Sequence, residues 1–376
     1  MKTVHIIYKN YLNSDEKSVS IGGIQTYISN LCEVFNELEY NISVYQMSDH
    51  NFECEYKNVM VRGYGGKIKD SEIAKYIFSK MKVFVKDFDL ILFGSEQYCC
   101  STPGFCSIAI QHGITWDKPN RGGSGQFEYL LGFAKKAVKS WKIISRVGQV
   151  ENIVCVDHNF PNWYRAMVSH PSMKLKVITN FTEVPPINVS KHDNHLIRII
   201  FARRLFEYRG TKVFVHAIKT LLDDKLPISV TIAGDGPDEN WMKQELSKYE
   251  NVSFIHYKSE ESLRIHSMHH VAVVPTVGSE GTSLSLLEAM ASSCAVVCSD
   301  VGGMTNIVID KYNGLLCGAG SVEELAEAIT YLVQEPDERK KLAKTGYETV
   351  SSAFSLERWK KEWADYIKHI ERSRNK

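Results

Sequence analysis

Residues 270–303 read HVAVVPTVGSEGTSLSLLEAMASSCAVVCSDVGG, and this stretch decides the fold. It begins with an apolar, β-branched run that Pro275 ends, which is typical of a buried parallel strand. Ser279 or Thr282 can cap a helix after it, and the residues predicted to face the core at helical spacing are Leu284, Leu287 and Ala291. A second apolar run, AVVCSDV, follows. This order of strand, loop, helix and strand predicts a doubly wound α/β sheet.

Two glutamates frame the start of the predicted helix. Glu280 stands before the helix and Glu288 falls on its second or third turn, so both side chains can face one crevice. The crevice lies at the carboxyl end of a strand, where such sheets bind ligands and free helix amides favour an anion. Gly281 lets backbone approach a ligand closely. A carboxylate accepts hydrogen bonds from vicinal hydroxyls through both of its oxygens. Two carboxylates in one crevice therefore suit a ligand that has a sugar at one end and a ribose at the other.

The stretch resembles the Glu-x7-Glu signature of retaining GT-B glycosyltransferases of family 4, also called glycosyl transferases group 1. EGTSLSLLEAMA and the following AVVCSDVGG stand where that family carries its donor site. The resemblance covers essentially the whole chain. It implies two Rossmann-like, doubly wound domains that face a cleft, with a C-terminal helix that crosses back to the first domain. The alternative is that neither glutamate binds a ligand: Glu280 is then a charged residue of a loop, and Glu288 a solvated charged residue of a helix.

A second motif follows the apolar run HLIRIIFA in the segment RRLFEYRG. Arg204 and Arg209 stand between a strand end and a helix start, where guanidiniums can grip a diphosphate through paired hydrogen bonds. The segment resembles the family's Gly-Arg-Leu...Lys-Gly pattern, with Arg204 on the family arginine and Arg209 in place of lysine. Arg203 replaces a glycine of that pattern, and we expect it to crowd the approach of backbone to phosphate. The alternative is that Arg204 and Arg209 are surface arginines of a loop and bind no ligand.

Three further sites rest on the resemblance. His112, after the run CSIAIQ, matches the family histidine that contacts the donor sugar near its C6 hydroxyl; a structural histidine is the alternative. The run GGIQTY matches the loop that faces the donor diphosphate and the acceptor, although a plain tight turn fits equally well. The base is expected at main-chain groups that follow the strand NVSFIHY.

The resemblance therefore implies a catalytic set and a substrate-binding set. The catalytic set is Glu280, Arg204, Arg209 and His112. The substrate-binding set is Gly22, Gly23, Gly281, Thr282, Ser283, Glu288, Tyr257 and Lys258. No cofactor and no metal are expected, because the nucleotide diphosphate sugar is a substrate and the arginines neutralise its charge. Asp87-Phe88-Asp89 spells the metal-binding Asp-x-Asp pattern of another class, but it precedes its strand, at the end away from a ligand crevice.

Length and composition are consistent with the predicted two-domain fold. The 376 residues suit two domains, which we place at 1–182 and 195–355, with a linker at 183–194 and a helix at 356–376 that packs back on the first domain. A formal net charge of +1 argues against a nucleic-acid partner. The nine cysteines show no zinc spacing, and no signal peptide or membrane span is visible, so we expect a cytoplasmic protein.

One helical stretch stands apart. Residues 127–147 mix apolar side chains with lysines, a pattern that fits an anionic membrane surface at the inner membrane face. It also fits a core helix with solvated charges, which we favour.

The resemblance thus implies a retaining glycosyltransferase for a hexose or N-acetylhexosamine carried by a nucleotide diphosphate, with uridine the expected base. The acceptor is expected to be a hydroxyl of a saccharide or of a lipid-linked saccharide, as in cell-surface polysaccharide assembly. Two alternatives share the architecture: a nucleotide-sugar 2-epimerase, and a non-catalytic nucleotide-sugar-binding subunit of a transferase complex. The intact set of charged residues favours the transferase over both.

Overall fold

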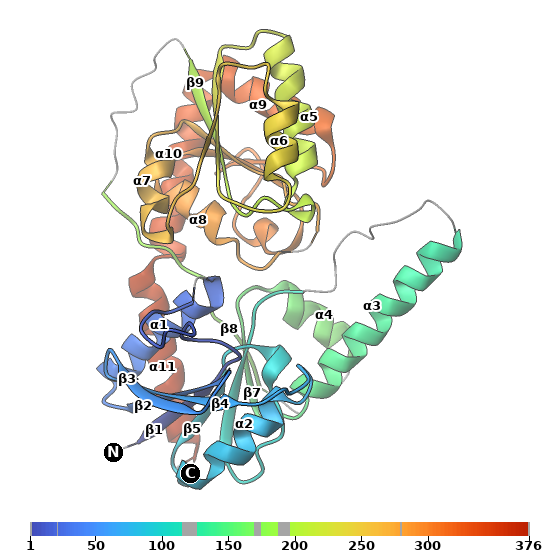
Figure 1. Ribbon diagram of the computed structural model, residues 1–376. Helices are drawn as coiled ribbons and strands as arrows, with labels where there is room; N and C mark the ends of the chain where they lie inside the picture. The colour runs from blue at the N-terminus through green and yellow to red at the C-terminus, as the bar shows by residue number, and fades with distance from the viewer. Residues whose placement is uncertain are drawn as a thin grey trace. The chain divides into compact units, whose positions relative to one another are not determined.

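The computed structural model describes residues 2–20, 22–114, 126–168, 174–186, 196–278 and 280–374. The chain separates into two compact units (Figure 1). The first unit comprises the described residues of 1–112, 123–178 and 359–376, and the second comprises those of 113–122 and 179–358.

The first unit is built on an eight-stranded sheet of order β3-β4-β2-β1-β5-β6-β7-β8. Neighbouring strands run parallel except β3 and β4. The short strand β3 was not predicted, because its sequence FECEY alternates half-buried and exposed positions and offers no apolar run. The strands are β1 (Thr3–Ile7), β2 (Asn41–Ser48), β3 (Phe52–Tyr56), β4 (Val59–Gly65), β5 (Leu90–Phe93), β6 (Cys106–Gln111), β7 (Asn152–Cys155) and β8 (Lys174–Val177).

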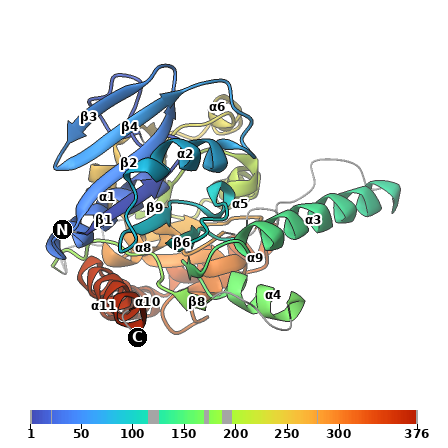
Figure 2. The same ribbon diagram turned by 90° about the horizontal axis from the view of Figure 1, so that it is seen from below.

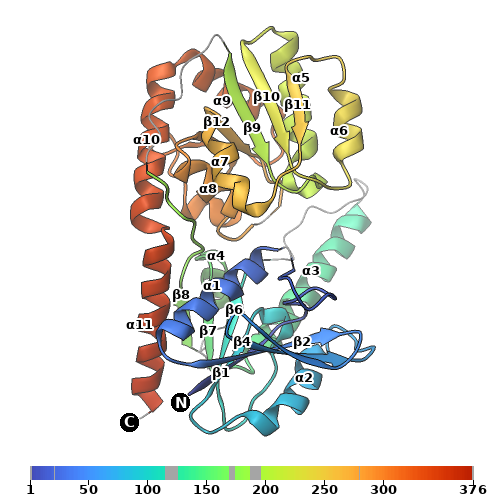
Figure 3. The same cartoon turned by 60° about the vertical axis from the view of Figure 1, so that its left-hand side comes forward.

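Helices of the first unit follow the apolar patterns of the sequence. They are α1 (Gly23–Glu37), α2 (Ile73–Met81), α3 (Gln126–Val147), α4 (Asn159–Met167) and α11 (Leu356–Arg374). Helix α11 buries Trp359 and Trp363 completely, and the Trp363 indole donates to the Tyr27 hydroxyl of α1 at 2.9 Å. Lys360 of α11 pairs with Glu33 of α1. The predicted return of the C-terminal helix to the first unit is therefore confirmed (Figure 3).

The second unit holds a six-stranded, wholly parallel sheet of order β11-β10-β9-β12-β13-β14. Its strands are β9 (Ile197–Ala202), β10 (Ile228–Ala233), β11 (Val252–Ile255), β12 (Val271–Val274), β13 (Ala295–Ser299) and β14 (Leu315–Cys317). Its helices are α5 (Thr211–Asp223), α6 (Glu239–Glu245), α7 (Ser262–Ser267), α8 (Leu284–Ala291), α9 (Val322–Gln334) and α10 (Pro336–Ala353).

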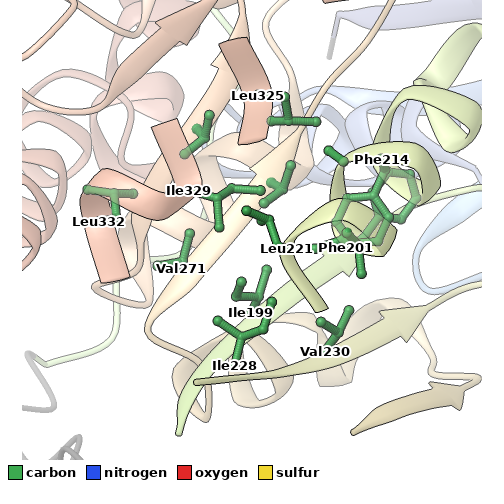
Figure 4. Packing of buried hydrophobic residues seen from close by; sticks show 14 of the residues in the cluster. Ile199, Phe201, Phe214, Leu221, Ile228, Val230, Val271, Leu325, Ile329 and Leu332 are labelled. Atoms are coloured by element: carbon green, nitrogen blue, oxygen red, sulfur yellow. The ribbon is translucent and has the colours of Figure 1, made fainter. Parts of the chain in front are cut away.

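Fully buried apolar side chains hold this sheet to its helices. Phe201 of β9 meets Phe214 of α5 at a ring-centroid distance of 4.7 Å, and Leu325 and Ile329 of α9 close the same layer (Figure 4). Burying one such side chain stabilises the fold by about 1.5–3 kcal/mol. The layer fixes β9 beside β12, where the strand order reverses, and the crevice at such a reversal is where doubly wound sheets bind ligands.

Candidate active site

An ion-pair cluster occupies the strand-order reversal of the second unit. Arg203 directly follows β9, and Thr276 and Glu280 follow β12. The Arg203 guanidinium donates from Nη2 to Oε2 and Oε1 of Glu280, at 2.8 and 3.1 Å. Its Nη1 donates to Thr276 Oγ1 at 2.6 Å, and that hydroxyl donates to Glu280 Oε2 at 2.8 Å. Arg209 forms a second ion pair with Glu280.

The cluster keeps Glu280 ionised. Burial alone would raise the pKa of Glu280, but the charges of Arg203 and Arg209 outweigh it and lower this pKa to about 2. Two guanidiniums then face a single carboxylate, which leaves a surplus of positive charge at the end of β9. A pyrophosphate is the kind of ligand that such a surplus attracts.

Arg203 does not occupy the position that the sequence suggested. We expected its side chain to crowd the backbone where a phosphate approaches. Instead the side chain is 4% exposed and turns inward to Glu280 and Thr276. The residue that differs from the family pattern is therefore part of the cluster, and its partner lies 77 positions away in the sequence.

Arg209 reaches Glu280 because the chain passes unusually close to β12. Gly210, at φ 88°, follows Arg209, and a Cβ at this position would lie 1.8 Å from the carbonyl oxygen of Pro275. Only glycine permits both that backbone conformation and that approach. The Arg204 side chain is exposed and makes no hydrogen bond or ion pair with the described residues, so it is available to a ligand.

The loop that carries Glu280 is fixed by its own backbone. The Gly303 N–H donates to the Glu280 carbonyl oxygen, and a Cβ on Gly303 would lie 2.5 Å from the carbonyl carbon of Gly281. Asn180 Nδ2 donates to the carbonyl oxygen of Thr282 at 2.8 Å. Helix α8 then begins at Leu284, so its N-cap is Ser283 and the predicted cap at Thr282 is wrong; Ser279 lies outside the described residues.

Glu288 lies on α8 in a different environment from Glu280. It accepts a hydrogen bond from Ser262 Oγ at 2.6 Å, and burial raises its pKa to about 7. Tyr257 lies near it: burial raises the pKa of Tyr257 to about 12, and the charge of Glu288 adds to the rise. Ser262 was not predicted, since one serine on a short helix carries no signal in the sequence. The N–H of Lys258 donates to Glu261 Oε2 at 3.0 Å, so one expected main-chain donor already has a partner.

In the first unit, His112 follows β6 and lies edge-on against Tyr27, with ring centroids 5.3 Å apart. Its Nε2 lies 2.9 Å from the carbonyl oxygen of Gly94, and because a carbonyl only accepts, Nε2 carries the proton. Burial lowers the pKa of His112 to about 4, so the ring is neutral at pH 7 and its Nδ1 is an acceptor. Gly22 and Gly23 form the N-cap and first residue of α1.

Glu96 lies beside His112 and was not predicted. It is 1% exposed, and its Oε2 accepts from the His112 N–H at 3.5 Å and from Ser95 Oγ at 3.2 Å. Its Oε1 has no hydrogen-bond partner among the described residues. Burial raises the pKa of Glu96 to about 7, so this carboxyl titrates near neutral pH.

The structure thus groups the predicted residues by unit. The cluster around Glu280, the start of α8, Glu288, Tyr257 and Lys258 belong to the second unit, at the carboxyl ends of its strands. His112, Gly22 and Gly23 belong to the first. Across the described residues, no group of three or more His, Cys, Asp or Glu side chains is placed to hold a metal ion. Asp89 of the Asp-x-Asp pattern is 1% exposed and caps the amino ends of β1 and β5, accepting from the backbone of Thr3 and Lys86.

Solved structures share this fold over almost the whole chain. The Anabaena protein HepE, in complex with UDP and glucose, is similar with a TM-score of 0.69 at 12% sequence identity. The match covers 98% of this chain and 100% of that chain. The fold is the GT-B fold of glycosyltransferases, which confirms the predicted fold class.

Sequence comparisons then give the family. Residues 187–349 match the model of the family Glycosyl transferases group 1. An uncharacterized glycosyltransferase of Methanocaldococcus jannaschii is 24% identical over 385 residues, which cover 94% of this chain and 95% of that protein. The N,N'-diacetylbacillosaminyl-diphospho-undecaprenol alpha-1,3-N-acetylgalactosaminyltransferase of Campylobacter jejuni is 30% identical over 154 residues, 40% of this chain and 39% of that enzyme. Residues 187–349 therefore form a domain of the family Glycosyl transferases group 1, and the chain is a glycosyltransferase, an enzyme that transfers a sugar from a nucleotide-sugar donor.

Proposed function

We propose that the enzyme transfers a hexose or N-acetylhexosamine from a UDP-linked donor, with retention of configuration, to a hydroxyl of a saccharide or lipid-linked saccharide. The observation that carries this proposal is Glu280 held between Arg203 and Arg209 where the strand order reverses. An ionised carboxylate beside a surplus of guanidinium charge suits a sugar hydroxyl on one side and a pyrophosphate on the other.

The chemistry follows from these charges. The bond between the anomeric carbon and the β-phosphate oxygen breaks, and the electron pair leaves with the phosphate. Arg204 and Arg209, with the first amides of α8, stabilise that charge without a metal. The acceptor oxygen bonds to the anomeric carbon from the same face, and the leaving phosphate takes the acceptor's proton.

The remaining residues orient the donor. Glu280 positions the transferred sugar, and the carboxylate of Glu288 accepts from the ribose hydroxyls, with Tyr257 and Lys258 at the base. His112 accepts a hydrogen bond from a sugar hydroxyl at Nδ1. This nitrogen can accept because the ring is neutral and carries its proton on Nε2.

Two relatives support the finer parts of this proposal. The structure of HepE was solved with UDP and glucose, which favours a uridine nucleotide. The Campylobacter jejuni relative is named for an acceptor linked to undecaprenol through a diphosphate, which favours a lipid-linked saccharide as the acceptor.

A donor panel tests the proposal. The purified protein is incubated with UDP-glucose, UDP-galactose and their N-acetylamino forms, with and without membrane extract, and released UDP and changed sugar are measured. UDP release that depends on the extract supports a transferase. Conversion of the donor sugar without any extract identifies an epimerase, and binding without turnover under every condition identifies a non-catalytic subunit. Either of these results contradicts the proposal.

The raised pKa of Glu288 makes donor affinity depend on pH. The ribose hydroxyls need an ionised acceptor, so we expect the affinity for a UDP-sugar to increase about tenfold between pH 6 and pH 8. A UDP-sugar is the right probe because its diphosphate diester does not titrate in this range. Calorimetric titration of Glu288→Gln should give weaker binding with no pH dependence. A wild-type affinity that stays constant from pH 6 to pH 8 contradicts the role of Glu288.

A further inference from the structure

Helix α3 exposes apolar side chains that no other part of the described chain covers. Phe133 is 66% exposed and Trp141 is 71% exposed, and Leu130, Leu131 and Val138 are also exposed. The last turns of the helix are anchored, because Ile143 and Val147 are buried. The rest of α3 runs out beyond the sheet of the first unit (Figures 1 and 2). The interpretation that we favoured from the sequence, a core helix, is therefore wrong for most of its length.

The apolar side chains form one stripe. Leu130, Phe133, Val138 and Trp141 recur at intervals of three to five residues, with Ala134 and Ala137 between them, so they share one side of the helix. The stripe is about 16 Å long. A soluble surface rarely leaves so many large apolar side chains together in water, which indicates an interaction surface.

The opposite side of α3 is cationic. Lys135, Lys139 and Lys142 lie there, Lys136 flanks the stripe, and the sequence contains no acidic residue between Leu130 and Val150. A surface for another folded protein normally mixes both signs of charge around its apolar centre. Apolar side chains on one side and only lysines on the other are instead typical of a helix that lies in the headgroup layer of an anionic bilayer.

We propose that α3 docks the enzyme on an anionic lipid bilayer, with Phe133 and Trp141 inserted below the headgroups and the lysines among the lipid phosphates. No helix within the described residues has the length and apolar character to cross a bilayer. The proposal deepens the proposed function, because an enzyme held at a bilayer meets an acceptor whose lipid is embedded there. It predicts that the acceptor is presented at a membrane surface.

Vesicle sedimentation of the full chain tests this inference. Vesicles of phosphatidylcholine alone are compared with vesicles that also contain phosphatidylglycerol. We expect the wild type to sediment only with the anionic vesicles, and added salt to weaken this binding. The double variant Lys139→Gln/Lys142→Gln should bind the anionic vesicles at least about tenfold more weakly than the wild type. The double variant Phe133→Ser/Trp141→Ser should lose binding.

A matched control removes the same charge elsewhere in the first unit. Lys67 and Lys69 are exposed, and changing both to glutamine should leave vesicle binding as in the wild type. Thermal unfolding and UDP binding of every variant should also match the wild type, which separates failure of the docking surface from failure of the fold or of the donor site. Equal binding to neutral vesicles, or unchanged binding of both helix variants, overturns the proposal. The proposal is also overturned if the wild type self-associates and the variant Phe133→Ser with Trp141→Ser does not. A second copy of the chain would then cover the stripe.

Discussion

Replacing Arg209 with alanine is expected to lower the turnover number by about two to three orders of magnitude, the usual cost of removing a donor that stabilises charge in the transition state. Arg209 is the cation that Gly210 brings against Glu280, at the end of β9 where we place the leaving phosphate. The charge on that phosphate grows as the sugar bond breaks, so turnover should fall more than donor affinity does.

Two further variants make this prediction specific. Arg209→Lys restores the residue that the family pattern carries and keeps the charge, so it should stay within about tenfold of the wild type. Arg204→Ala should also depress turnover more than affinity, because the exposed Arg204 side chain has no partner among the described residues and is available to the phosphate. Steady-state rates and donor affinities are measured for all three. Wild-type turnover in both alanine variants would show that the phosphate lies elsewhere.

Replacing Glu280 with glutamine is expected to destabilise the second unit as well as stop transfer. Lowering the pKa of a carboxyl from 4.5 to about 2 contributes about 3 kcal/mol to the free energy of unfolding at neutral pH. The amide loses this contribution and leaves Arg203, which is 4% exposed, without an ionised partner. For a unit of this size, the unfolding temperature at pH 7 should fall by about 6–12 °C in scanning calorimetry.

The pH dependence of this loss identifies its cause. Because the pKa of Glu280 is lowered in the folded state, its stabilisation is complete at neutral pH and disappears as the pH falls from 4.5 toward about 2. The difference between wild type and Glu280→Gln should shrink over the same range. Glu288→Gln is the matched control: its pKa is raised to about 7, so the folded state favours the neutral form and this variant should not be destabilised at pH 7. An equal loss in both variants would contradict the ion-pair account.

The sequence predicted those parts of the site that depend on local order. The strand–loop–helix around Glu280 and the loop of Arg204 and Arg209 are local signals that the sequence carries. The ion pair of Arg209 with Glu280, beside the adjacent ends of β9 and β12, was not predicted. The role of Arg203 was not predictable in the same way. Its contacts with Glu280 and Thr276 span more than seventy positions and depend on how β9 and β12 pair.

Helix α3 and Glu96 show two other limits of sequence reasoning. The apolar stripe of α3 is the same pattern whether a core or a bilayer covers it, so only the exposure of Trp141 and Phe133 distinguishes the two. Glu96 lies in the unremarkable segment GSEQY, and its raised pKa arises from burial beside His112, which no local pattern encodes.

The central claim is that the second unit binds the donor pyrophosphate over Arg204 and Arg209, with Glu280 at the sugar and Glu288 at the ribose. A crystal structure of the full chain with UDP tests it most directly. The account predicts the β-phosphate within hydrogen-bond distance of Arg209 and the first amides of α8, and the ribose hydroxyls on Glu288. A pyrophosphate bound away from both arginines would contradict it.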